Sequence, residues 1–257
     1  MLLRHFILLP VMASLALAQS ELPAVPPGQA VPADMERAAE ISKSRVIRID
    51  QTRFQIGEVV IDTKTRELRF PSQVNMVDGL LEYLLVLQQG KVHEAMLISE
   101  IAPTHLNLAF ALLRYTASPE LFPTVDPTGH LTEIYPKVSA EVKAGARISI
   151  AVEWSDQGTT RRIPVNEWIQ HSVKTTVMPA GPWLYTGSDF HEGKYVPEIT
   201  GDVAAILLAP AAIINYPGTD NEDDTAWVAF PKRIPPLGTK VTVIIAPYSN
   251  IKNLEKP

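Results

Sequence analysis

The chain has 257 residues, of which 46% are hydrophobic and 20% are charged, so it can bury a sizeable core and is not a disordered polymer. Its formal net charge of -5 argues against a general nucleic-acid binder, which needs a basic surface to neutralise phosphates. The absence of cysteine excludes disulfides, a cysteine nucleophile, thiolate zinc sites and cysteine-ligated iron–sulfur clusters.

The N-terminus has the layout of a secretory signal peptide over residues 1–18. A short basic start precedes an apolar run, and Ala16-Leu17-Ala18 ends in the small-residue pattern typical of a cleavage site. The run is shorter than the roughly 20 apolar residues that span a bilayer, and no later stretch reaches that length. We therefore expect an exported protein, periplasmic or extracellular, with no integral membrane span after cleavage. The alternative is an uncleaved anchor.

A tether rich in proline and alanine is expected over residues 19–45. Its four prolines before residue 34 favour extended backbone, and residues 34–42 could form a short helix. We expect one folded domain over 46–250 and a tail over 251–257.

The first half of the domain predicts strands and one helix. A hairpin joins 59–61 to 67–70, and two further strands cover 82–87 and 92–101. Pro103 permits a helix start, and residues 104–115 are apolar nearly all round, which is typical of a buried helix. The proline-rich segment 117–136 is expected to be an excursion loop.

The second half is also mostly strand. Residues 146–154 alternate cleanly, and Asp156-Gln157-Gly158 turns them back into 159–163. Residues 165–170 suggest one helical turn, 183–185 and 195–198 a pair of strands, and 203–208, 227–230 and 240–245 three more strands. The fold class is therefore α+β, mainly antiparallel β with one buried helix near 104–115, in a single compact domain. Strands and helices do not alternate, which argues against a Rossmann fold and against a barrel.

Common catalytic signatures are absent. The chain has no G-x-S-x-G elbow, no phosphate-binding G-x-x-x-x-G-K and no G-x-G-x-x-G. The zinc motif H-E-x-x-H fails twice, because Leu97 and Tyr195 stand where the second histidine belongs. The sequence therefore identifies no catalytic mechanism.

One candidate site lies at His93, Glu94 and His105. If 92–101 is a strand, His93 and Glu94 point to opposite faces and cannot serve one site without a bulge. His105 lies in the first turn of the following helix, whose dipole favours the neutral imidazole that ligates metals or accepts a proton. A strand followed by a helix could bring the two imidazoles together. The alternative is that both histidines only bind backbone groups at the 101–104 corner.

A second candidate is the acidic run 220–224, which has four carboxylates in five residues. Such a run could bind Ca²⁺, although the EF-hand glycine is missing, and a solvated loop is the alternative. A third candidate is aromatic. Trp154, Trp168, Trp183 and Trp227 are expected in the core, whereas an exposed pair would suit a sugar or peptide groove.

Several separated blocks resemble the YdjY-domain family. They are Gly90–Leu97, Thr104–Ala109, Val165–Ile169, Pro179–Ser188, and Pro210–Asn215 followed by 220–227. The resemblance covers roughly residues 54–245 and implies an exported bacterial protein, with no catalytic residues to carry over. Some members carry a ferredoxin-like name, which cannot hold here because an iron–sulfur cluster needs cysteine ligands.

The first functional hypothesis is an exported cell-envelope domain that binds an unknown ligand or an envelope protein, through an aromatic groove or an open sheet edge. The candidate functional residues are His93, Glu94, His105, Trp183 and Trp227.

The alternative is a metal-dependent hydrolase or metal-binding protein. His93, His105, Asp223 and Asp224 would hold a divalent cation, which would lower the pKa of a bound water. A purely structural module of a surface assembly is a third possibility.

Overall fold

The computed structural model describes residues 46–248, all of which belong to one compact unit of the chain. The predicted signal peptide (1–18), tether (19–45), short helix (34–42) and tail (251–257) lie outside the described residues. Within 46–248, no helix is both long and apolar enough to cross a bilayer.

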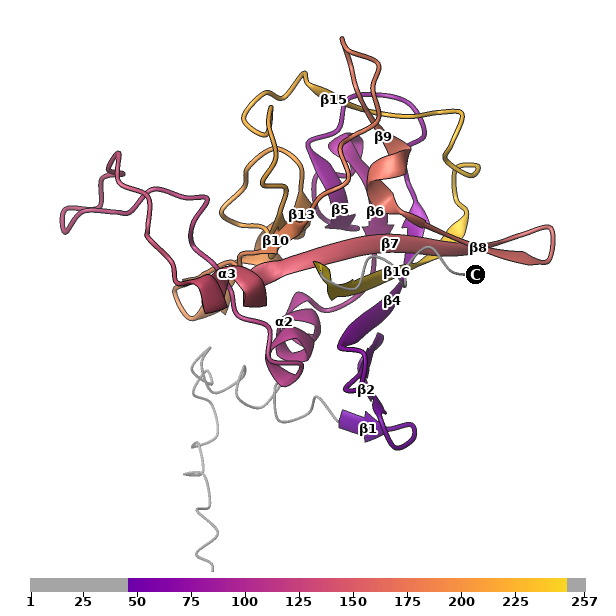
Figure 1. The fold of residues 1–257 in the computed structure, drawn as a ribbon, viewed down its shortest axis with the longest axis horizontal. Helices are drawn as coiled ribbons and strands as arrows, with labels where there is room; N and C mark the ends of the chain where they lie inside the picture. The colour runs from indigo at the N-terminus through magenta and orange to yellow at the C-terminus, as the bar shows by residue number, and fades with distance from the viewer. Residues whose placement is uncertain (1–45, 249–257) are drawn as a thin grey trace, which may run out of the picture. The chain divides into compact units, whose positions relative to one another are not determined.

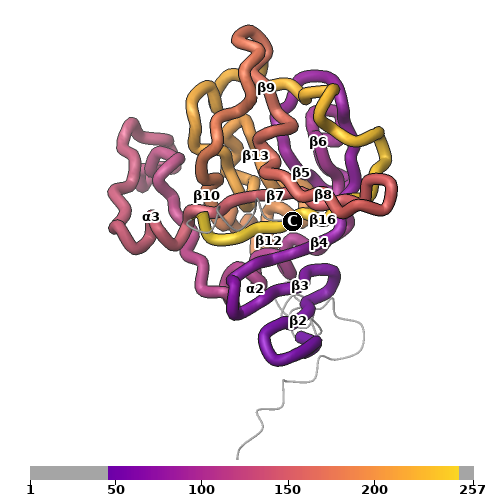
Figure 2. The backbone as a smooth tube through the Cα atoms, turned by 45° about the vertical axis from the view of Figure 1, so that its right-hand side comes forward, coloured from indigo at the N-terminus to yellow at the C-terminus, as the bar shows by residue number. Residues whose placement is uncertain are grey.

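The described part begins with four antiparallel strands connected in sequence order. They are β1 (Val46–Arg48), β2 (Arg53–Ile56), β3 (Val59–Asp62) and β4 (Glu67–Val74). The predicted hairpin at 59–70 is confirmed. Both ribbon views show β2 below the central strands and near α2 (Pro103–Leu112) (Figures 1 and 2), and α2 also contacts β3.

A closed barrel forms the centre of the domain. Its strand order is β4, β16, β7, β10, β14, β13, β5 and β6, and the ring closes because β6 also pairs with β4. The other strands of the ring are β5 (Tyr83–Leu87), β6 (Ala95–Ser99), β7 (Arg147–Asp156), β10 (Trp183–Tyr185), β13 (Asp202–Ala205), β14 (Ile214–Asn215) and β16 (Lys240–Pro247).

The barrel corrects one sequence-based prediction. The lack of alternating helices excludes only a barrel of parallel strands, because antiparallel strands can close a ring through hairpins and loops. Most pairings are antiparallel, as predicted, but β5 pairs with β6, and β13 with β14, in parallel. The domain is therefore mostly β, and its class as α+β with one buried helix is only partly confirmed.

The remaining elements surround the ring. The strand β8 (Thr159–Pro164) forms the predicted hairpin with β7, and two small ladders join β9 (Ile169–His171) to β15 (Trp227–Ala229) and β11 (Phe190–His191) to β12 (Lys194–Tyr195). The other helical elements are α3 (Ala140–Ala146), α4 (Val196–Thr200) and the 3-10 turns η1 (Val92–Glu94) and η2 (Val165–Trp168). The segment 117–136 is the predicted excursion loop, with one isolated bridge from Val125 to Leu131.

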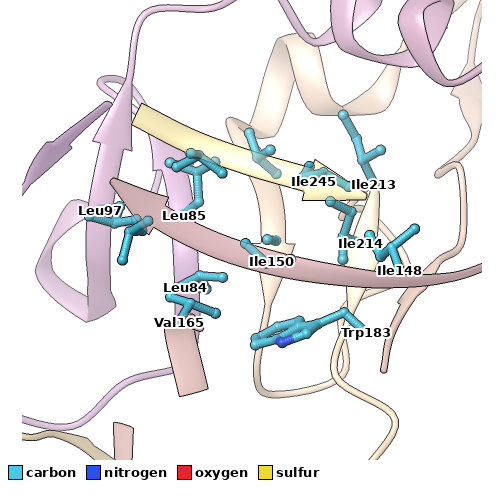
Figure 3. Close-up of a cluster of buried hydrophobic side chains, with 14 of the residues drawn as sticks. Leu84, Leu85, Leu97, Ile148, Ile150, Val165, Trp183, Ile213, Ile214 and Ile245 are labelled. Carbon is cyan, nitrogen blue, oxygen red and sulfur yellow. The ribbon is translucent and has the colours of Figure 1, made fainter. Parts of the chain in front are cut away.

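Apolar side chains fill the ring. Ile150 of β7 lies opposite Ile245 of β16 and Ile148 lies opposite Trp183 of β10, and Figure 3 shows all four in one cluster of side chains that are at most 3% exposed. The helix α2 buries Leu106, Ala109 and Phe110 but leaves Leu112 exposed, so only one of its faces is in the core.

The predicted strand at 195–198 is wrong, because the chain turns into α4 directly after Tyr195. Pro197 lies in the first turn of this helix, where its missing N–H is tolerated, and Gly201 ends the helix with a left-handed φ of 78°. Residues 183–185 pair instead with β7 and β14.

Gly201 also makes a close backbone contact. A Cβ at Gly201 would lie 2.8 Å from the Cα and N of Gly90, and the Gly201 carbonyl accepts a hydrogen bond from Leu87 N at 2.8 Å. This contact holds the loop after β5 against the end of α4, and it thereby places Lys91 next to Asp202.

Gly201→Ala should lower the free energy of unfolding by about 2–4 kcal/mol, because left-handed strain and a backbone clash add together. The matched control is Gly193→Ala. Gly193 has a similar φ of 76°, but apart from its two chain neighbours no described residue lies within 4 Å of the place that its Cβ would take, so only about 1–2 kcal/mol should be lost. Urea unfolding of both variants measures the difference. Equal losses of unfolding free energy would show that the contact between Gly201 and Gly90 does not constrain position 201.

Candidate functional site

The pair His93 and Glu94 lies in the 3-10 turn η1, not in a strand. The predicted strand 92–101 is therefore wrong over its first three residues, and only Ala95–Ser99 forms β6. The side-chain amide of Asn75 fixes the turn by donating to the carbonyls of Val92 at 2.6 Å and Ala95 at 2.7 Å. Because the turn does not alternate, His93 Nε2 lies 3.4 Å from Glu94 Oε1, on the same side.

A charged cluster surrounds Lys91. The Lys91 ammonium lies 3.5 Å from Glu82 Oε2, 4.0 Å from Glu94 Oε2 and 5.2 Å from the centre of the Tyr83 ring. Asp202 completes what we call the Lys91 cluster, which comprises Glu82, Tyr83, Lys91, Glu94 and Asp202. Three carboxylates thus face one ammonium, and His93 lies exposed at the rim.

Two oxygens of the Lys91 cluster are buried without a hydrogen bond from any residue of the described range. They are Glu94 Oε2 and Asp202 Oδ1. Burial raises the pKa of Asp202, and the nearby Lys91 charge opposes this rise only in part. Burial and the charge of Asp202 likewise raise the pKa of Tyr83. The Lys91 cluster is not an open cation site, because the Lys91 ammonium already occupies the place that a cation would take.

His105 lies in the first turn of α2, as predicted, but it is not next to His93. The whole of β6 separates the two residues, since His93 precedes the strand and His105 follows it. The His105 ring lies against Gly57 in the β2–β3 turn, where any Cβ would overlap it. Two neighbours also connect α2 to the rest of the fold, because Thr104 donates to Glu198 and Asn107 accepts from the Tyr185 hydroxyl.

Three of the four tryptophans are core residues, as expected. Trp168, Trp183 and Trp227 are at most 3% exposed, and the half-buried Trp154 packs 5.3 Å from Trp168. The indole N–H groups of Trp168 and Trp227 have no acceptor among the described residues. No exposed tryptophan pair forms a groove here.

A groove does form beside Tyr216, whose ring packs on two of the buried tryptophans, Trp183 and Trp227. Residues 179–182 and 216–219 make its two walls, Leu184 lies in its floor, and its volume is about 390 Å³. We call it the proline groove, because Pro179, Pro182 and Pro217 stiffen its walls. Tyr216 stands between the groove and the core, with its ring 5.5 Å from Trp183 and 5.8 Å from Trp227.

The polar end of the proline groove is an ion pair. Arg147, at the start of β7, lies 3.5 Å from Glu120 Oε1 and also donates to the Lys143 carbonyl. Glu120 Oε2 is buried and has no hydrogen-bond partner within 46–248. Sequence analysis missed both residues, because they are far apart in the chain and belong to no motif.

The acidic run 220–224 lies beside this groove, and Asp220 and Asp223 in it are bound by neighbouring residues. Asp220 binds Lys174 at 2.9 Å and lies 3.4 Å from His171 Nε2, whereas Asp223 accepts from the backbone and hydroxyl of Thr225. The hydrogen bond from Lys174 holds the pKa of Asp220 below its usual value, and the Thr225 hydroxyl does the same for Asp223. These contacts favour the solvated-loop interpretation of the run.

Buried His171 was also missed by the sequence analysis. Its Nδ1 accepts from the backbone N–H groups of Val173 at 3.2 Å and Lys174 at 3.3 Å, which assigns the ring proton to Nε2, facing Asp220. Its ring also packs 5.3 Å from Trp227, so it braces the aromatic layer behind Tyr216.

Among residues 46–248, no group of three or more histidine and acidic side chains is arranged to hold a metal ion. The structure does not bring His93 and His105 together, so metal binding by them with Asp223 and Asp224 stays a prediction.

Comparison with known proteins gives one match. The family model for the YdjY domain matches residues 59–246, which lie inside the predicted domain 46–250. No curated protein and no solved structure matches the chain.

Asp202→Asn should raise the melting temperature at pH 7–8. A carboxyl group whose pKa is raised in the folded state binds more protons there than in the unfolded chain. Stability is therefore highest below the unfolded pKa of about 4 and falls as the pH rises through the folded value. Thermal melts at several pH values should show the gain of Asp202→Asn shrinking towards pH 4. The exposed Asp224→Asn is the control, and a lower melting temperature of Asp202→Asn at pH 7.5 would show that the ionised carboxylate stabilises the fold.

Proposed function

The chain belongs to the YdjY-domain family, and from this premise we propose that it is an exported cell-envelope domain that binds peptide segments in its proline groove. The observation that carries the proposal is Glu120 Oε2, which is buried beside Arg147 in a groove of about 390 Å³ and has no hydrogen-bond partner among the described residues. The signal-peptide pattern over residues 1–18 supports export.

The walls of the groove suit binding because they are rigid. Proline has a fixed φ, so the segments 179–182 and 216–219 lose little conformational freedom when a ligand enters. Behind the groove, Trp183 and Trp227 hold Tyr216 in place, and the Tyr216 ring covers Gly218 so closely that no Cβ would fit there. The groove is therefore formed before any ligand arrives.

The ion pair between Arg147 and Glu120 indicates the chemistry of the ligand. A guanidinium can take a carboxylate with two hydrogen bonds, and an unpaired carboxylate oxygen needs an N–H donor. The C-terminal end of a peptide carries both groups, because its carboxylate follows an amide N–H directly. Apolar contact with Leu184 and the prolines would accommodate the last side chains. The geometry thus favours a carboxylate-ended peptide over a neutral ligand.

We expect residues 19–257, once immobilised, to retain peptides that end in a free carboxylate more strongly than the same peptides with an amidated C-terminus. Arg147→Gln should weaken binding by about tenfold or more, because a hydrogen bond to a charged group is lost. Two identical peptide pools, one free and one amidated, measure the preference by mass spectrometry of the retained fraction.

Two variants test the place of binding. Gly181→Leu puts a side chain into open space at the groove wall, since nothing lies within 4 Å of a Cβ there, so it should block binding without lowering the melting temperature. The control is Arg161→Gln, which changes an exposed arginine paired with Asp156 on β8. Retention of neither pool, or equal retention by wild type and Arg147→Gln, would refute the proposal.

A further inference from the structure

The edge of β4 that closes the barrel is divided between two neighbours. Residues 67–69 pair with β3, and residues 73–74 pair with β6. Residues 70–72 between them have no strand partner on this edge. Ser99 fills one position, because its hydroxyl donates to the Pro71 carbonyl at 2.7 Å. The rest of the gap opens into a cavity of about 270 Å³, which we call the gap cavity.

A buried serine stands where the pattern of β4 requires an apolar residue. Leu68, Phe70 and Val74 point inward from β4 and are at most 1% exposed, and Ser72 is the fourth member of this row. Its cross-strand neighbour is the core residue Val241. Ser72 is 5% exposed and lines the gap cavity, and its hydroxyl has no hydrogen-bond partner among residues 46–248. An unpaired buried hydroxyl destabilises a fold, so a serine here needs another explanation.

The rest of the lining mixes apolar and polar residues and carries a net negative charge. Its charged members are Glu58, Glu100 and a single cation, Lys240, which already donates to Gln73 at 2.8 Å. Glu100 accepts a long hydrogen bond from Gln88, whereas Glu58 has no ion pair within the described part of the chain. A ligand with a protonated amine would give Glu58 a partner, and a hydroxyl on the same ligand would give Ser72 one.

We propose that the gap cavity is a second binding site, separate from the proline groove, for a small hydroxylated amine of the size of one amino sugar. The volume lies below the range of pockets for drug-sized ligands, which fits a single ring. Ser72 binds a hydroxyl group, and Glu58 with Glu100 binds the ammonium. The site exists because one strand edge cannot pair with two neighbours along its whole length.

The test uses residues 19–257 and three probes: glucosamine, glucose and N-acetylglucosamine. Glucosamine is the only one with a positive charge. Calorimetry should show glucosamine binding at least about tenfold more tightly than the two neutral sugars, with a dissociation constant no weaker than about 10 mM. Failure of glucosamine to bind in this range, or equal binding of all three sugars, would overturn the proposal.

Two variants separate binding from a structural role. Ser72→Ala should abolish most of the glucosamine binding and yet raise the melting temperature by about 2–4 °C, because it removes the unpaired hydroxyl. If the Ser72 hydroxyl stabilised the fold, Ser72→Ala would instead lower the melting temperature.

Glu58→Gln should remove the preference for glucosamine over glucose. Its control is Glu133→Gln, which changes an exposed carboxylate of the excursion loop and should leave binding unchanged. Unchanged binding in both Ser72→Ala and Glu58→Gln would place the sugar elsewhere and refute the site. Because none of these residues lines the proline groove, peptide retention should be normal in every variant.

Discussion

One strand, β4, must pair with both β3 and β6 along the same edge, and most features of the domain follow from this constraint. The pairing with β6 closes the barrel, but it extends over only two residue pairs. Asn75, directly after β4, extends the junction by binding the backbone of Met96 and the turn η1. Without these contacts the barrel would open between β4 and β6, where the ring closes. The gap at residues 70–72 and the position of His93 and Glu94 are thus two consequences of one closure.

The same constraint explains which parts of the fold the sequence could predict. Local signals were sufficient for the β3–β4 hairpin, and also for β7 and β8, whose turn contains Gln157 and Gly158 with positive φ. Closure is a long-range event between strands that have no local signature for it, so the barrel was missed. A strand was predicted from Val92 onward, but the side chain of Asn75 binds the Val92 carbonyl and holds a 3-10 turn there. A tertiary hydrogen bond therefore overrode the local pattern.

Of the candidate site, only the aromatic residues behind the proline groove were predictable from the sequence. The tryptophan content pointed to an aromatic core, and Trp183 and Trp227 do lie behind the proline groove. The polar end of the groove was not predictable, because Glu120 comes from the excursion loop and Arg147 from the start of β7. Proline-glycine segments at 179–182 and 216–218 were the only available signal, and they read equally well as ordinary turns. The proline groove forms where loops that are distant in the sequence come together, and no local sequence pattern predicts that.

The edge strand β8, one part of the sheet edge considered as a binding surface for this chain, is poorly suited to recognition. The strand β8 pairs only with β7 in the described part of the chain, so its outer edge is free. However, that edge carries the neighbouring arginines Arg161 and Arg162, and it ends at Pro164, which has no N–H to donate. Charges and proline at an edge are devices that prevent another strand from adding to it. Strand addition is therefore disfavoured at β8, and a peptide is better accommodated in a concave site away from this edge. The proline groove fits this requirement because its rigid walls recognise a chain end by its charge and its terminal N–H, without adding a strand to the sheet.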